Sequence, residues 1–438
     1  WWTSGSREDN YYQCPLKSAC IGGSYEKDEN GTITVKKYRC APGYASTVCA
    51  TCDVGYYLSE ERCLKCPEQQ ADSSLIVTLT FTGVFIGFFA MLLNVMKVKT
   101  SKQHWNIMKM DTVDHKKKKK LDRKTLKKIR IFSKFAMTTL KCFIGYVQIL
   151  SVSNTAFKIP WPKGFLSFLS VLSPFNLDFL SISGVGCIVK FDFYTSYVTM
   201  MIMPIMLLLF VLIAYVVGLK RHKMHFGKKF TSAMSKSYTN HVLQFTMWIV
   251  IIAYPPVSRR AIQYITCSEK IDGKQYLVQD YTLECFDGQW NEFLPFAIFA
   301  LTVYPLGVPA FFAYKLWSLH DKLKDSNVIA RYGFLYEMYR PGVYWWDVYE
   351  MLQKLLLTGL IVLIFPGKKL QVVIACLFDL LFLMNLLIQK PHNQGPTRNL
   401  AMMANMALTM TMYCGLVLVS VESTQNYTLL FDGVLVAM

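Results

Sequence analysis

Charged residues are scarce in this chain: they make up 17% of its 438 residues, whereas 53% are hydrophobic. The apolar residues are gathered into long blocks, which is typical of a protein that crosses a membrane several times. Histidine is also scarce, with seven scattered residues, and there is no His/Cys metal cluster, nucleophile motif or phosphate-binding loop. Enzyme active sites are built from such groupings. We therefore expect no enzymatic activity, no cofactor and no bound metal.

Two further motifs are missing. The chain has no "TVGYG"-like segment and no regular arginine ladder, so neither a potassium filter nor a voltage sensor is predicted. Lys and Arg outnumber Asp and Glu by 47 to 29, but the basic residues lie in loops between the apolar blocks. This arrangement excludes nucleic acid as the expected partner.

Eight apolar blocks are long enough to cross a bilayer, which takes roughly 20 residues. We predict an all-α polytopic membrane domain over residues 73–438. The chain begins at Trp1 without a signal peptide, so we expect it to be part of a longer protein. The predicted spans are Leu75–Met96, Phe132–Val152, Tyr194–Leu219, Val242–Val257, Phe293–Trp317, Trp345–Phe365, Leu370–Ile388 and Leu400–Val421, with a ninth starting at Leu429.

Basic loops predict the orientation. The run "DHKKKKKLDRKTLKKIR" lies in loop 97–130 between the first two spans, and Lys and Arg are enriched on the cytoplasmic side of membranes. This puts the N-terminus outside, in a plasma, flagellar or endomembrane, and glycosylation sequons at Asn30 and Asn426 then both lie outside. The basic run is either a solvated tether or a site for anionic inner-leaflet lipid, through Lys116, Lys117, Lys118, Lys119 and Lys120.

Cysteines cluster at the N-terminus, which predicts a disulfide-rich extracellular module over residues 1–72. Its "C-x-x-G-Y" kernels are similar to EGF-like and ephrin-receptor-like modules, which either bind a partner or cap a membrane domain. Cys267 and Cys285 share the outer loop 257–291 and are expected to pair, and one module cysteine, with Cys66 as the candidate, is expected to bond Cys187. The module contains Cys14, Cys20, Cys40, Cys49, Cys52, Cys63 and Cys66.

Ionisable residues occur inside the predicted spans, where they should face the bundle interior or water rather than lipid. The sixth span carries three of them on one helix face, the second has a similar polar stripe, and the seventh has one near its middle. They either form buried ion pairs, Lys354–Asp379 and Lys134 with Asp347 or Glu350, or line a hydrated path for ions. This polar seam comprises Lys134, Lys141, Gln148, Asp347, Glu350, Lys354 and Asp379.

The fifth span contains "YPLGVP", with Pro305, Gly307 and Pro309. Each proline removes a backbone hydrogen bond and can kink the helix. We predict a hinge that changes the width of a pore, with a static kink as the alternative.

Several long segments resemble one family: "AYPPVSRRAIQYITC", "YPLGVPAFFAYKLW", "FLYEMYRPGVYWWDVYEMLQKLLLTG" and "QKPHNQGPTRNLAMMANMALTMTMYCGLVL". They are similar to TRP-like channel proteins of algae and protists that carry an ephrin-receptor-like ectodomain, and more distantly to fungal TRP-like and flavin-carrier proteins. The resemblance implies an ion channel. We expect a channel that is cation-permeable and gated by force or lipid, with the polar faces of the second, sixth and seventh spans near the conduction path, and a homo-oligomer if one subunit cannot enclose a pore. A secondary transporter or lipid-moving protein, and an adhesion or receptor protein, remain as alternatives.

Overall fold

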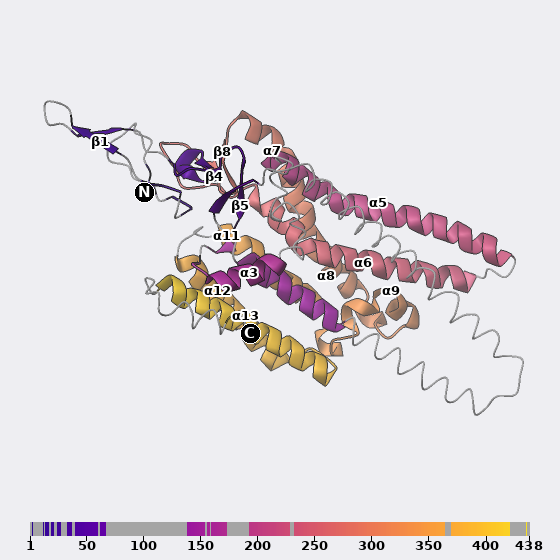
Figure 1. Ribbon diagram of the computed structural model, residues 1–438. Helices are drawn as coiled ribbons and strands as arrows, with labels where there is room; N and C mark the ends of the chain where they lie inside the picture. Colours follow the sequence, from indigo (N-terminus) through magenta and orange to yellow (C-terminus); the bar gives the residue numbers. More distant parts are fainter. Residues whose placement is uncertain are drawn as a thin grey trace, which may run out of the picture.

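Long helices lie side by side in a bundle, and small β-hairpins gather at one end of it (Figure 1). We call this end the module end and the opposite end the far end. The computed structural model describes parts of residues 2–66, residues 138–172 apart from 154, 155 and 158, and residues 192–227, 232–363, 369–420 and 435.

Five helices among the described residues are long and apolar enough to cross a membrane. One of them consists of three consecutive elements, because its middle widens into a π-helix. The five are α5 (Phe193–Phe226), α6 (Ser232–Gln263), the run of α7 (Gly288–Leu301), η5 (Thr302–Gly307) and α8 (Val308–Ser318), α12 (Lys369–Gln389), and α13 (Gly395–Ser420).

The predicted count of eight spans is not supported. The first predicted span and the start of the ninth lie outside the described residues, and only residues 138–153 of the second are described as a helix. The predicted sixth span is helical, as α10 (Trp346–Leu355), η8 (Leu356–Leu360) and α11 (Ile361–Leu363). Its three ionisable side chains make it too polar to count as a span by composition alone.

Shorter elements connect the long helices. α3 packs through Phe165 and Leu169 into a buried cluster with α12 and α13, and α9 packs against α6 near the far end. Their bounds are α3 (Lys163–Leu172), η6 (His320–Lys322), α9 (Ser326–Tyr336) and η7 (Pro341–Val343).

The N-terminal cysteines are disulfide-bonded as Cys14–Cys20, Cys40–Cys49 and Cys52–Cys63, which confirms a disulfide-rich N-terminal region beside the helices. Its EGF-like character stays a prediction. Three antiparallel hairpins form there and a fourth lies in the loop between α6 and α7. The hairpins are β1 (Ser24–Lys27) with β2 (Ile33–Lys36), β3 (Tyr44–Ala45) with β4 (Thr51–Cys52), β5 (Tyr56–Ser59) with β6 (Arg62–Lys65), and β7 (Tyr276–Leu277) with β8 (Asp280–Glu284).

The N-terminal hairpins rest on the α6–α7 loop. The Tyr12 hydroxyl donates to Asp272 Oδ1 at 3.3 Å and accepts from the Asp272 backbone N–H at 3.0 Å. Strand β4 contacts β8, and both lie together at the module end (Figure 1). The two segments are far apart in sequence, so the loop provides a platform for the N-terminal region.

Candidate functional site

The polar face of α10 is buried inside the helix bundle. Asp347 and Lys354 are only 2% and 8% exposed. Asp347 lies in the first turn of the helix, where the backbone N–H groups favour a negative charge, and Lys354 lies in the last turn of α10. The sequence therefore places two buried ions on one helix face, and each must be satisfied by neighbouring elements.

Lys141, from the helix over residues 138–153, forms an ion pair with Asp347. The Tyr339 hydroxyl also donates to Asp347 Oδ1, at 3.1 Å. The prediction named Lys134 as the partner of Asp347 or Glu350, but Lys134 lies outside the described residues. Since an unpaired buried charge is strongly destabilising, the pair ties the 138–153 helix to α10.

A buried histidine lies next to this pair. His392 sits in the loop between α12 and α13, with its ring centroid 5.3 Å from that of Tyr339. The Arg340 N–H donates to the Pro391 carbonyl at 2.8 Å, and the Asn393 N–H donates to the Met338 carbonyl at 2.9 Å. These two backbone hydrogen bonds join the loop before α10 to the loop between α12 and α13. Sequence reasoning missed His392, although "QKPHNQGP" is among the segments that resemble the family.

Burial, reinforced by the positive charge of Lys141 and opposed by Asp347, lowers the pKa of His392 to about 4. Neither ring nitrogen has a hydrogen-bond partner among the described residues. The unfolded chain should bind the proton near the ordinary pKa of about 6.5. The contribution of His392 to the free energy of unfolding is therefore fully present above pH 6.5, and it is lost as the pH falls from 6.5 toward 4.

We expect the purified protein to lose about 1.5 kcal/mol of unfolding free energy between pH 7.5 and 5.5 through His392. Thermal unfolding in detergent at a series of pH values measures this loss. The His392→Gln variant has no proton to bind, so its stability should change less over the same range. An unchanged pH slope in that variant would contradict the assignment.

Asp379 is held by a second polar cluster. Gln353 Nε2 donates to Asp379 Oδ1 at 3.3 Å and to Asn405 Oδ1 at 3.1 Å, and the Thr409 hydroxyl donates to Asp379 Oδ2 at 2.7 Å. The predicted Lys354–Asp379 ion pair is therefore not formed. Amide and hydroxyl donors on α10 and α13 replace the lysine. Asn405 and Thr409 are four residues apart on α13, a spacing that puts both on the same helix face.

Gln148 has a structural partner in α6. Pro256 has no backbone N–H, so the Ile252 carbonyl loses its usual helical donor. The Gln148 side chain donates to that carbonyl at 2.9 Å. We interpret the Gln148 side chain as a replacement for the backbone N–H that Pro256 lacks in α6.

The predicted hinge residues lie at a π-helix. Pro305 and Gly307 belong to η5, and Pro309 is the second residue of α8. A Cβ on Gly307 would come within 3.1 Å of the Thr302 carbonyl oxygen, so the backbone approaches itself closely here. π-Helical turns are often found at functional sites, and the hinge role stays a prediction.

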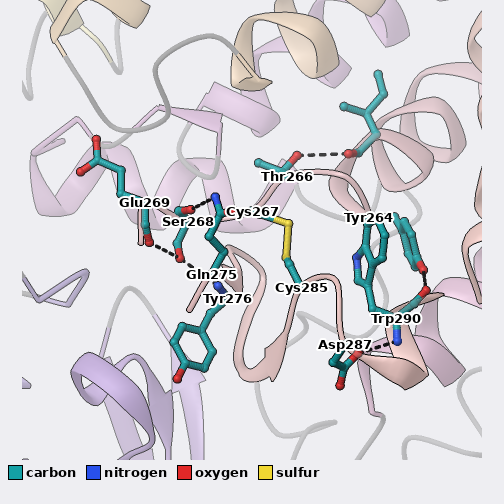
Figure 2. The surroundings of a disulfide bond; sticks show 11 residues. Tyr264, Thr266, Cys267, Ser268, Glu269, Gln275, Tyr276, Cys285, Asp287 and Trp290 are labelled. Carbon is teal, nitrogen blue, oxygen red and sulfur yellow. Dashed lines mark hydrogen bonds between the residues drawn. A yellow bond between two sulfur atoms is a disulfide. The ribbon is translucent and has the colours of Figure 1, made fainter. Parts of the chain in front are cut away.

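The loop between α6 and α7 is closed by a disulfide between Cys267 and Cys285. Figure 2 shows this bond beside the stacked rings of Tyr264 and Trp290, whose centroids lie 5.3 Å apart. The Asp287 carboxylate caps α7 by accepting from the Trp290 N–H at 2.6 Å. The loop is thus a rigid link between the two helices.

Other predicted site residues lie beyond the described part of the chain. Cys66 is disulfide-bonded, but its predicted partner Cys187 is not described, so that pairing stays a prediction. The same holds for the sequons at Asn30 and Asn426 and for the lipid-binding lysines of loop 97–130.

A sequence profile of the transient receptor potential (TRP) ion channel family matches residues 187–435. The match covers more than half of the chain. The chain belongs to the TRP ion channel family. No match was found among curated proteins or among solved structures. TRP membership and the apolar helices confirm an integral membrane protein of TRP-like channel type, while the ephrin-receptor-like ectodomain and the fungal relationship stay predictions. The TRP match includes η5, α10, α12 and α13, but it begins after Lys141.

Proposed function

We propose that this TRP-family chain forms a cation-permeable ion channel. The observation that supports cations over anions is the charge of the α6–α7 loop. The loop (residues 264–287) and the start of α7 up to Glu292 together contain six acidic side chains and two lysines, and all six acidic residues are at least partly exposed. A surface of one sign concentrates counter-ions around it. The acidic residues are Glu269, Asp272, Asp280, Glu284, Asp287 and Glu292.

The buried network has a different proposed role. Lys141 is paired with Asp347, and Asp379 is held by neutral donors. Lys141, Glu350 and Lys354 line one small cavity at this site, so the buried charges of both signs lie close together. This arrangement favours the ion-pair alternative, so we propose that the network fixes the positions of the helices and that cations cross elsewhere.

Reversal potentials test the proposal. Purified protein in planar bilayers, with a salt gradient across the membrane, should give currents that reverse near the equilibrium potential of the cation. Currents that reverse near the anion's potential, or no current under voltage, stretch or anionic lipid, would refute it.

Neutralising the loop tests its part in conduction. In the Glu269→Gln/Glu292→Gln variant, single-channel conductance should fall about twofold at low salt and recover at high salt, because salt screens exposed charge. Lys270→Gln removes a neighbouring positive charge and should raise the conductance. If both variants conduct like the wild type at low salt, the loop does not concentrate the permeant ion.

Further partners are proposed on the sequence alone. We propose a homo-oligomer, an anionic lipid bound by the basic loop 97–130, and an extracellular partner for the N-terminal module. The proposed orientation has the N-terminus and the α6–α7 loop outside.

A further inference from the structure

The α6–α7 loop presents a tight turn to the N-terminal module. Ile271 and Lys274 exchange backbone hydrogen bonds of 2.8 and 3.1 Å, so the two residues between them form the tip of the turn. Asp272 and Gly273 have positive φ values of 48° and 84°, which a type I′ turn requires at both positions. The turn therefore holds the backbone N–H and the carboxylate of Asp272 in a fixed orientation.

One side chain of the module contacts both of these groups. The Tyr12 hydroxyl donates to the Asp272 carboxylate and accepts from the Asp272 N–H, and both hydrogen bonds are exposed to solvent. Strand β4 and the short helix η1 (Thr47–Cys49) lie against β8 of the same loop. A hydrogen bond of this kind shifts an equilibrium by about two- to tenfold. The Tyr12 contact can therefore break and re-form while the module and the loop stay folded.

Behind the turn, the loop is joined firmly to both of its helices. The Ser268 N–H donates to the Tyr276 carbonyl at 2.7 Å, which continues the backbone pairing from the turn to the Cys267–Cys285 disulfide (Figure 2). The Cys285 N–H donates to the Gln275 carbonyl at 2.8 Å. A movement of the turn is therefore passed to the end of α6 and the start of α7 rather than absorbed within the loop.

The α7 helix carries such a movement toward the middle of the bundle. It is 14 residues long and continues directly into the π-helix η5. We propose that the N-terminal module regulates the open probability of the channel through the contact of Tyr12 with Asp272. This inference rests on the proposed cation channel. An extracellular partner or a force that acts on the module would reach α6 and α7 through the same turn.

Hydrogen–deuterium exchange tests the contact independently of conduction. In the purified protein in detergent, Tyr12→Phe should speed exchange of the Asp272 N–H by about fivefold, because phenylalanine has no hydroxyl to accept that hydrogen. Tyr57→Phe, in strand β5 of the same module, is the matched control. The Tyr57 hydroxyl has no hydrogen-bond partner among the described residues, so the rate should not change. Equal exchange in Tyr12→Phe and the wild type would overturn the contact.

Single-channel recording tests the coupling. Tyr12→Phe and Asp272→Gly should each change the open probability about threefold and in the same direction. Glycine keeps the positive φ of position 272. The double variant should change no more than either single variant, because all three lose one contact.

The two measurements together separate this inference from the channel itself. Faster exchange of the Asp272 N–H with an unchanged open probability would make the module a static cap, and would overturn the inference while leaving the cation channel intact. Effects of Tyr12→Phe and Asp272→Gly that add in the double variant would also overturn it. The lack of any cation current in the wild type would refute the proposed function, and this inference with it.

Discussion

Replacing Lys141 with methionine is expected to lower the free energy of unfolding by about 3–5 kcal/mol. The variant leaves the Asp347 carboxylate buried without its counter-ion, with the Tyr339 hydroxyl and the start of α10 left to stabilise it. Asp347→Asn should be similarly destabilising, since it leaves the ammonium of Lys141 without its counter-ion. Thermal unfolding and the monodisperse fraction on size-exclusion chromatography measure both losses.

The double variant Lys141→Met/Asp347→Leu distinguishes an ion pair from two independent contributions. Apolar replacement of a buried pair is often neutral or stabilising, so the double variant should recover most of the stability. Lys236→Met is the matched control, because Lys236 donates to Asn327 Oδ1 at 2.7 Å in an exposed position, and its loss should be below about 1 kcal/mol. Losses that simply add in the double variant would mean that the two side chains act separately.

Removing the Cys267–Cys285 disulfide is expected to have the second largest effect. The bond closes a loop with a sequence separation of 18 residues, and a loop of this size corresponds to about 3 kcal/mol of stabilisation. The loop joins the end of α6 to the start of α7 and carries Asp272, which Tyr12 contacts. We expect the Cys267→Ser/Cys285→Ser variant to unfold at a lower temperature.

Reductant and a matched cysteine serve as controls. Treating the wild type with reductant should lower the Tm at least as far as the double serine variant does, because reductant opens this loop and also the N-terminal disulfides. Cys376 is a free, half-buried thiol, so Cys376→Ser should leave the Tm nearly unchanged. A wild type and a double variant with equal Tm would show that the loop is held by its hairpin and aromatic contacts instead.

The sequence could predict which residues are buried ions, because an amphipathic pattern and a bilayer-length block are local properties. It could not predict their partners. Lys141 and Lys134 lie on the same predicted stripe, two turns apart. The lysine that pairs with Asp347 is decided by how far the second span is shifted along its axis relative to α10. Asp379 illustrates the same limit, since Gln353 reaches it while its neighbour Lys354 faces a cavity.

The two π-helices, η5 and η8, were also not predicted from the sequence. The prolines predicted a break near Pro305, but they did not predict that the break takes the form of a π-helix. Nothing in the sequence indicated the second π-helix, η8, where a Cβ on Gly359 would lie 2.6 Å from Ile262 Cδ1. The Cys267–Cys285 pair, by contrast, could be predicted, because two cysteines in one short loop have few other choices.

The π-helix η5 also decides which side chains of α8 face inward. A π turn inserts one extra residue, so its conversion to an α-helix would move every later residue by one position, about 100° around the axis. Phe311 would then take the place of the buried Phe312, one aromatic ring for another. Lys315 would take the place of Leu316, which is 1% exposed. α8 thus has a second register that its phenylalanines permit and that Lys315 opposes.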